Sequence, residues 1–197
     1  MARIPFTAPR TLSVRLGEHW SRRRFGTVIE PGRALAHQPQ VMRTLAMAEM
    51  GVERWNRLDP TLKALATLVG ASQIGCSWCM DFGYWESHHK GIDRRKLEDV
   101  PVWRDSDAYT ELERLVMGYA EAMTATPPEV TDEQVAELRE HLADDALVEL
   151  TAMVSVENQR SRTNAALGLA SQGFKASCTL TPVAGAQPAP APVGRAG

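Results

Sequence analysis

The sequence has little that would place the protein in a membrane or outside the cell. It contains no run of about 18 apolar residues, which is the length that a helix needs to cross a bilayer. The N-terminal stretch MARIPFTAPRTLSVRLG carries charges but lacks the continuous apolar core of a signal peptide. We therefore expect a cytoplasmic protein with no membrane partner.

Cysteine is scarce, and neither sign of charge dominates. Three cysteines are too few and too unevenly spaced for the disulfide framework of a secreted domain. The formal net charge of -2 gives no reason to expect nucleic acid as a partner. In a reducing cytosol, a close pair of cysteines is more often catalytic or metal-binding than a structural crosslink.

The sequence lacks alternating runs of β-branched residues that would form strands, whereas helix signals recur along its middle. Asp59 and Pro60 are typical of a helix start, as N-cap and first helical residue. Leu62, Leu65 and Val69 then recur at the spacing of one buried helix face. We predict an all-α fold of about seven helices.

The two ends of the chain differ in composition from the middle. Residues 1–38 contain several proline and glycine helix breakers, so we expect an irregular N-terminal segment. Residues 177–197 are rich in proline, alanine and glycine, which predicts a disordered tail. One helical domain over residues 39–176 remains between these segments.

The stretch IGCSWCMDFGYW contains the most informative motif, because two residues separate Cys76 from Cys79. Three interpretations are open: two buried thiols that pack together, half of a zinc site, or a redox pair. The zinc site is the weakest, because only Cys178, His88 and His89 remain as further ligands. Adjacent histidines point in different directions on a helix, so we expect no metal.

The redox interpretation fits the local chemistry best. A helix that starts after Gly75 places Cys76 near its N-terminus and Cys79 one turn further on. The free amides and the positive end of the helix dipole stabilise a thiolate there, and one turn brings two sulfurs within reach of a disulfide. In such pairs the first cysteine is normally the more exposed and the second lies deeper.

Three segments around this motif resemble one family. The segment LKALATLVGASQIGCSWCMDFG resembles the core helical hairpin of the carboxymuconolactone decarboxylase superfamily, in its alkylhydroperoxidase D-like branch. YTELERLVMGYAEAMTATPPEVTDEQVAELR resembles the helix pair that follows, and VENQRSRTNAALGLASQGF resembles the last helix of that family. The resemblance covers roughly Pro39 to Phe174 and implies an all-helical bundle that assembles as a trimer or hexamer.

Members of this branch with a CxxC motif generally act as thiol-dependent peroxide reductases or disulfide carriers. The resemblance implies that Cys79 attacks a peroxide and that Cys76 resolves the sulfenic acid as a disulfide, without a cofactor. A dithiol electron donor then reduces the pair. Trp78 and Phe82 either pack in the core or at a subunit contact, or line an apolar channel for a bulky peroxide or thiol substrate.

Two positions depart from the peroxidase branch. Where that branch has a histidine after the second cysteine, this chain has Gly83, and where it has a glutamate ahead of the pair, this chain has Ala64. Because those two groups form the relay that deprotonates the thiol, we expect weak or redirected peroxidase activity. A non-catalytic redox-sensing or scaffold protein of the same fold stays open, and a lactone decarboxylase-type enzyme ranks lower because that branch lacks the CxxC motif.

Other polar groups are candidates for the missing relay. Asp81 lies two residues after Cys79 and is a candidate base. A polar cluster occupies the last long helix, formed by Glu157, Asn158, Arg160, Arg162 and Asn164. It either holds helices or subunits together through hydrogen bonds or, through Glu157 or Asn164, faces the cysteine pair as a substitute relay. Cys178 is an incidental thiol or a resolving one.

Overall fold

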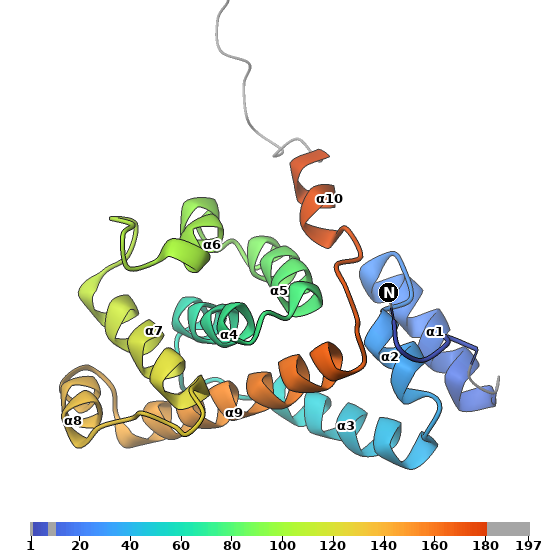
Figure 1. The fold of residues 1–197 in the computed structure, drawn as a ribbon, viewed down its shortest axis with the longest axis horizontal. Helices are drawn as coiled ribbons and strands as arrows, with labels where there is room; N and C mark the ends of the chain where they lie inside the picture. Colours follow the sequence, from blue (N-terminus) through green and yellow to red (C-terminus); the bar gives the residue numbers. More distant parts are fainter. Residues whose placement is uncertain (1, 8–10, 181–197) are drawn as a thin grey trace, which may run out of the picture.

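The computed structural model describes residues 2–7 and 11–180 (Figure 1). Within these residues the chain forms ten α-helices, one 3₁₀ helix and no strand, which confirms the all-α prediction with more helices than expected. None of the described helices is long and apolar enough to cross a bilayer. The elements are α1 (Leu12–Phe25), α2 (Glu30–Leu35), α3 (Pro39–Val52), α4 (Pro60–Ile74), α5 (Ser77–His89), α6 (Arg94–Asp99), η1 (Val100–Val102), α7 (Glu111–Thr124), α8 (Asp132–His141), α9 (Asp144–Ala166) and α10 (Phe174–Leu180).

Helix α4 is the central element of the fold. It packs against α5, α7 and α9 (Figure 1). Leu65 and Ala66 on this helix have no exposed surface. The carboxylate of Asp59 accepts the amides of Thr61 and Leu62 at 2.8 and 3.3 Å, which caps the start of the helix. The start signal and the buried face that the sequence indicated are both confirmed.

A tight turn at Gly75 joins α4 to α5. Gly75 has φ 76°, a left-handed conformation that glycine adopts without steric penalty. The amide of Cys76 donates to the carbonyl of Ala71 at 3.0 Å, and the amide of Gly75 donates to that of Ser72 at 3.1 Å. These bonds close the end of α4 and leave Cys76 as the N-cap of α5.

Gly83 lets α5 lie close against α4. A Cβ atom at this position would come within 2.9 Å of Leu68 Cδ2, and Leu68 is itself buried with 2% of its surface exposed. A histidine side chain at position 83 therefore does not fit between these two helices unless Leu68 or the helix moves. Position 83 is where the peroxidase branch has its relay histidine. In this chain, Leu68 of α4 lies in the space that a side chain at that position would take.

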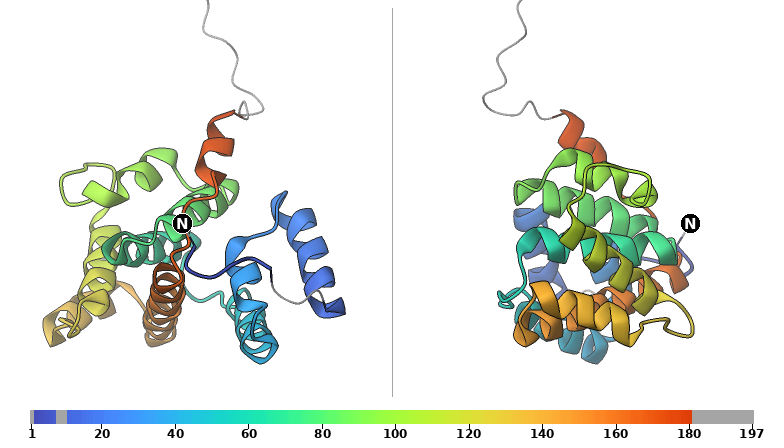
Figure 2. Two further views of the ribbon diagram at one scale, coloured as in Figure 1. Left: turned by 45° about the vertical axis from the view of Figure 1, so that its right-hand side comes forward. Right: turned by 90° about the vertical axis from the view of Figure 1, so that its left-hand side faces the viewer.

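The expectation of an irregular N-terminal segment is wrong for most of residues 1–38, because this segment contains α1 and α2. Thr11 caps α1 by accepting the amide of Val14 at 3.3 Å. Pro31 lies in the first turn of α2, where a residue needs no amide donor and proline favours the helix. Together with α3, these helices lie on the opposite side of the bundle from α7 and α8 (Figure 2).

The C-terminal end of the domain also differs from the expected boundary. Helix α10 continues past residue 176 and reaches Leu180. The remainder of the tail expected from its composition, residues 181–197, lies outside the described residues. The segment that leads into α10 runs back over α5, so the two ends of the described chain meet near that helix.

Asp81 of α5 fixes the start of α10. Its carboxylate accepts the backbone amides of Gln172 at 2.9 Å, Phe174 at 3.0 Å and Lys175 at 2.8 Å. The side chain is buried, with 7% of its surface exposed. A carboxylate from α5 thus caps a helix that follows about 90 residues later in the chain, a role like that of an N-cap side chain.

We predict that Asp81→Ala lowers the free energy of unfolding by about 2 kcal/mol, because buried amides lose a charged acceptor. Hydrogen exchange should speed up at the amides of Gln172, Phe174 and Lys175. Asp93→Ala is the matched control, since Asp93 caps only α6. Unchanged protection of the three amides in Asp81→Ala would contradict this anchoring role.

Candidate active site around the cysteine pair

Cys76 and Cys79 are joined by a disulfide, with their Cα atoms 5.3 Å apart. Cys76 is the N-cap of α5, and its Sγ accepts the backbone amide of Cys79 at 3.2 Å. The expected placement of the pair at a helix start is therefore confirmed. Cys76 thus lies at the positive end of the α5 dipole.

The order of burial within the pair is the reverse of the expected one. Cys76 has 1% of its surface exposed and Cys79 has 7%. The reason lies in the cap, since a side chain at this position folds back over the first turn of its own helix to reach the Cys79 amide. Cys79 is consequently the more exposed residue of the two, although both are buried.

An apolar cover drawn from both ends of the chain surrounds the pair. Its buried members are Ala34, Ala71, Trp78, Leu169 and Phe174. Partly buried residues add to it: Ala2, Ile4, Phe6, Phe25, Ile29, Met80, Phe82, Trp85 and Leu167. Arg3 ties the N-terminal part of the cover to the end of α9, because its guanidinium donates to the carbonyl of Ala166 at 2.7 Å. The disulfide therefore lies in surroundings of low polarity.

Trp78 and Phe82, the predicted substrate-binding residues, both belong to this cover. Their rings stack with centroids 4.9 Å apart and an angle of 13° between the planes. Trp78 Nε1 donates to Gln172 Oε1 at 2.8 Å, and Phe82 meets Phe174 edge-on at 5.2 Å. These contacts give both residues a packing role beside the cysteine pair, and a role in binding substrate stays a prediction.

Asp81, the predicted base, has other partners. Its two carboxylate oxygens accept the three amides at the start of α10. No hydrogen bond joins it to Cys76 or Cys79 within the described part of the chain. The structure places Asp81 on the same helix as the pair but engages it in anchoring the C-terminal segment.

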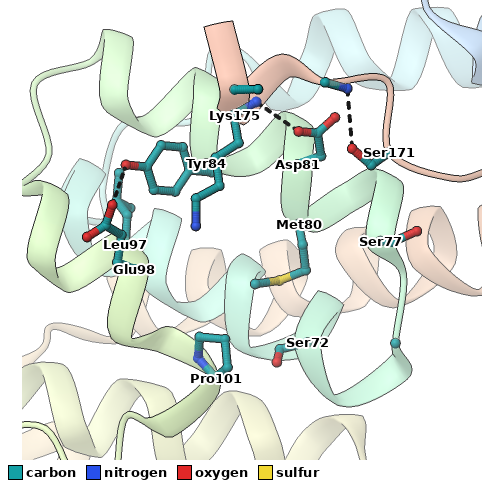
Figure 3. Close-up of a pocket in the computed structure, with 13 residues that line it drawn as sticks. Ser72, Ser77, Met80, Asp81, Tyr84, Leu97, Glu98, Pro101, Ser171 and Lys175 are labelled. Carbon is teal, nitrogen blue, oxygen red and sulfur yellow. Dashed lines mark hydrogen bonds between the residues drawn. The ribbon is translucent and has the colours of Figure 1, made fainter. Parts of the chain in front are cut away.

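A cavity of about 740 Å³ opens beside α5 (Figure 3). Met80, Leu97 and Pro101 line it together with polar groups, among them Glu98 and Lys175. Figure 3 shows these side chains converging from α5, α6, η1 and α10. Neither cysteine of the pair lines this cavity, but Gly75, Ser77 and Met80, which are their neighbours in the chain, do.

The polar group in contact with the pair comes from α9. Asn164 Nδ2 donates to Cys79 Sγ at 3.3 Å, and both residues are buried. Earlier on the same helix, Ser161 Oγ donates to Glu157 Oε1 at 2.6 Å. The spacing of Glu157, Ser161 and Asn164 places them on one face of α9, in a buried polar row that we call the α9 row. Asn164 thus faces the pair as the sequence suggested.

Glu157 is a buried carboxyl group with only partial charge compensation. Burial raises the pKa of the Glu157 carboxyl to about 7, and the nearby Arg160 guanidinium opposes this rise. Arg160 is turned mainly toward Glu49 of α3, with its Nε 2.8 Å from Glu49 Oε1, and approaches Glu157 Oε2 only to 3.6 Å. A group with this pKa can both accept and release a proton near neutral pH.

The rest of the polar cluster holds helices together. Asn158 Nδ2 donates to Thr124 Oγ1 at 2.8 Å, and Arg162 donates to the Thr124 carbonyl at 3.0 Å. These bonds fasten α9 to the end of α7. The structural interpretation thus holds for Asn158 and Arg162, while a relay role for Glu157 or Asn164 stays a prediction. The sequence reading passed over Ser161, which the helical spacing from Glu157 could have indicated.

The third cysteine is separate from the pair. Cys178 is half-buried on α10, where its Sγ donates to the carbonyl of Phe174 at 3.7 Å. Burial raises the pKa of the Cys178 thiol. It packs against the main core, whereas the pair belongs to the smaller apolar cluster under the cover. In the described part of the chain, no group of three or more histidine, cysteine or acidic side chains is placed to hold a metal ion.

The sequence is similar to one family over its helical core. Residues 39–122 match the profile of the Carboxymuconolactone decarboxylase family. YnjA of Escherichia coli is 33% identical over 154 residues, which make up 78% of this chain and 85% of YnjA.

Solved structures share the fold. ATU0492 of Agrobacterium tumefaciens is a protein of unknown function whose name also carries AhpD, an antioxidant defence protein. It has a TM-score of 0.64 at 26% identity, over 71% of this chain and 94% of its own. The debrominase Bmp8 in complex with 2,3,4-tribromopyrrole has a TM-score of 0.77 at 16% identity, over 91% of this chain and 98% of its own, a likeness of fold alone. The chain thus belongs to the carboxymuconolactone decarboxylase family and has the fold of its alkylhydroperoxidase D-like branch.

Proposed function

We propose that the protein is a thiol-dependent oxidoreductase that reduces peroxides with the Cys76–Cys79 pair. The observation that carries this proposal is a disulfide at the start of α5, under an apolar cover, with an amide donor directed at one sulfur. Cysteines that only fill space need neither a helix N-terminus nor a polar partner. This site supplies both.

Cys79 is the attacking thiol in the proposal. It is the more exposed of the two, and the amide of Asn164 donates to its sulfur, which stabilises a thiolate. The thiolate attacks one oxygen of the peroxide and breaks the O–O bond. Cys79 becomes a sulfenic acid, and the other oxygen leaves with a proton as an alcohol, or as water when the substrate is hydrogen peroxide.

Cys76 completes the oxidative half of the cycle. Its thiol condenses with the sulfenic acid, releases water and forms the disulfide present in the structure. A dithiol donor then attacks the more exposed Cys79 sulfur, and Cys76 leaves as a thiolate stabilised by the Cys79 amide. The second thiol of the donor displaces Cys79, so two electrons pass from the donor to the peroxide.

The apolar cover favours an organic hydroperoxide as substrate. Trp78 and Phe82 border the pair with aromatic faces, which attract an apolar group more than a small polar molecule. No cofactor is needed, because sulfur carries the electrons. A dithiol donor of this kind operates in a reducing compartment, which supports a cytoplasmic location.

We also propose that the protein works as a homo-oligomer, a trimer or a hexamer. Helix α3 contains no buried residue although it carries many apolar side chains, and Met47 is 68% exposed. Leu12, Leu16 and Trp20 follow one face of α1 and are also exposed. Apolar helix faces of this kind commonly mark contacts between protein chains.

A second candidate function is a redox switch without turnover, in which the pair alters a contact with another protein. The near-complete burial of both sulfurs favours it, because a buried disulfide exchanges slowly with outside thiols. The two candidates differ in how fast the reduced pair reacts with a peroxide.

We predict that the reduced protein forms its disulfide rapidly with cumene hydroperoxide and that Cys79→Ser slows peroxide consumption more than about 1000-fold, because the attacking sulfur is gone. Stopped-flow fluorescence follows the reaction, and Cys178→Ser is the control that should react like the wild type. A wild-type rate no faster than that of an ordinary thiol would overturn the proposal of a peroxide-reducing enzyme and would favour the redox switch.

We predict that Cys76→Ser still consumes one equivalent of peroxide but stops at a sulfenic acid, because no resolving thiol remains. Trapping with dimedone and mass spectrometry should locate the adduct on Cys79. The two roles would be reversed if the Cys76→Ser variant gave no dimedone adduct on Cys79 and the Cys79→Ser variant gave one on Cys76.

A further inference from the structure

The relay positions and the acidic side chains of α5 in the hairpin that carries the cysteine pair offer no uncommitted group to take the thiol proton. Ala64 and Gly83 stand at the two positions where the peroxidase branch has its relay. Asp81 is engaged by the amides of α10. Glu86, further along α5, lies partly exposed and pairs with Lys90 at 3.1 Å. The helix that contacts the Cys79 sulfur, which is α9, is therefore the next candidate source of a proton acceptor.

The α9 row leads from the Cys79 sulfur to a carboxyl group. Asn164 contacts the sulfur, Ser161 lies one helical turn before Asn164, and Glu157 lies one turn before Ser161. The exposed fractions of Glu157, Ser161 and Asn164 are 6%, 0% and 6%. A hydrogen bond between Ser161 and Glu157 already joins two of its three members, in a part of the protein shielded from water.

We infer that Glu157, acting through Ser161, accepts the proton of the Cys79 thiol, while Asn164 holds the sulfur for attack on the peroxide. This inference deepens the proposed function and rests on it. Opening of the disulfide frees the Cys79 side chain to turn toward Ser161. The thiol proton passes to Ser161 Oγ as Ser161 gives its own proton to Glu157 Oε1. The reverse transfer protonates the leaving alkoxide, so an alcohol departs and Glu157 ends ionised.

The charges around Glu157 suit this task. Arg160 on the same helix favours the ionised form, whereas burial and the charge of Glu49 on α3 favour the protonated form. The negative charge of Glu86 on α5 raises the pKa of Arg160, so Glu86 also belongs to the charged groups around Glu157. The balance raises the pKa of Glu157 to about 7. A base works best when its pKa is near the operating pH, because it then both accepts and returns the proton readily.

The first test is the pH dependence of the reaction between reduced protein and cumene hydroperoxide. The ionised fraction of Glu157 grows with pH, so the wild-type rate should rise with pH through about 7. Glu157→Gln should lower the rate about 100-fold and remove that rise. Glu149→Gln is the matched control, since Glu149 is an equally buried carboxyl on α9 that pairs with Lys63, and it should leave the pH profile unchanged.

Ser161→Ala gives a second test that keeps Glu157 in place. It removes the hydroxyl that is hydrogen-bonded to Glu157 and that carries the proton in this inference, and the rate at neutral pH should fall about 10-fold. Wild-type rates and pH profiles in both Glu157→Gln and Ser161→Ala would overturn the inference. If Cys79→Ser still abolished the reaction, the proposed function would survive that outcome.

Alkylation of Cys79 by iodoacetamide tests the same coupling without a peroxide. In a Cys76→Ser, Cys178→Ser background, Cys79 is the one remaining cysteine. Two groups that share a proton titrate in two steps, so the alkylation rate should show two steps with pH, and one after Glu157→Gln. A single step in both proteins would overturn the inference. If the alkylation rate showed two steps with pH but the protein failed to reduce peroxide, the proposed function would be wrong while the coupling of Glu157 to Cys79 would be supported.

Discussion

The close packing of α5 against α4 is the constraint on which the site depends. Leu68 fills the space beside Gly83, so a side chain at that position would have to displace Leu68 or shift the helix. The cysteine pair is held between this hairpin and α9, and the polar groups that reach it come from α9 instead. In the proposed mechanism the cysteines act at the start of α5, while the proton acceptor lies on α9.

Burial links the separate parts of this site. The apolar cover that surrounds the disulfide lowers the local polarity, and the same lack of water raises the pKa of Glu157. In such surroundings the hydrogen bonds from Asn164 to Cys79 and from Ser161 to Glu157 are stronger than they would be in water. Both cysteines are buried, so in the proposed function a substrate reaches them through apolar surroundings.

Much of this arrangement could be predicted from local sequence. Helix starts such as Asp59 and the glycine turn before Cys76 are set by residues only a few positions apart. Local sequence does not predict α1 and α2, because prolines near them are typical helix breakers, although Pro31 lies in a first helical turn where proline is favourable. Short segments of this kind depend on what they pack against as much as on their own sequence.

The features that escaped prediction rest on contacts between distant segments. Asp81 looks like a base beside a cysteine, yet its partners are amides that follow some 90 residues later. The greater burial of Cys76 follows from the direction of a cap side chain, which spacing alone does not give. Asn164 was a candidate because it stood in a polar cluster, but only the packing of α9 brings it to Cys79.

The most direct measurement is a titration of the fully reduced protein with one equivalent of cumene hydroperoxide, followed by peptide mapping and measurement of the alcohol released. The account predicts one equivalent of alcohol and one intramolecular disulfide between Cys76 and Cys79, with Cys178 still reduced. Oxidation at Cys178, crosslinks between chains, or unreacted peroxide beside a reduced pair would contradict it.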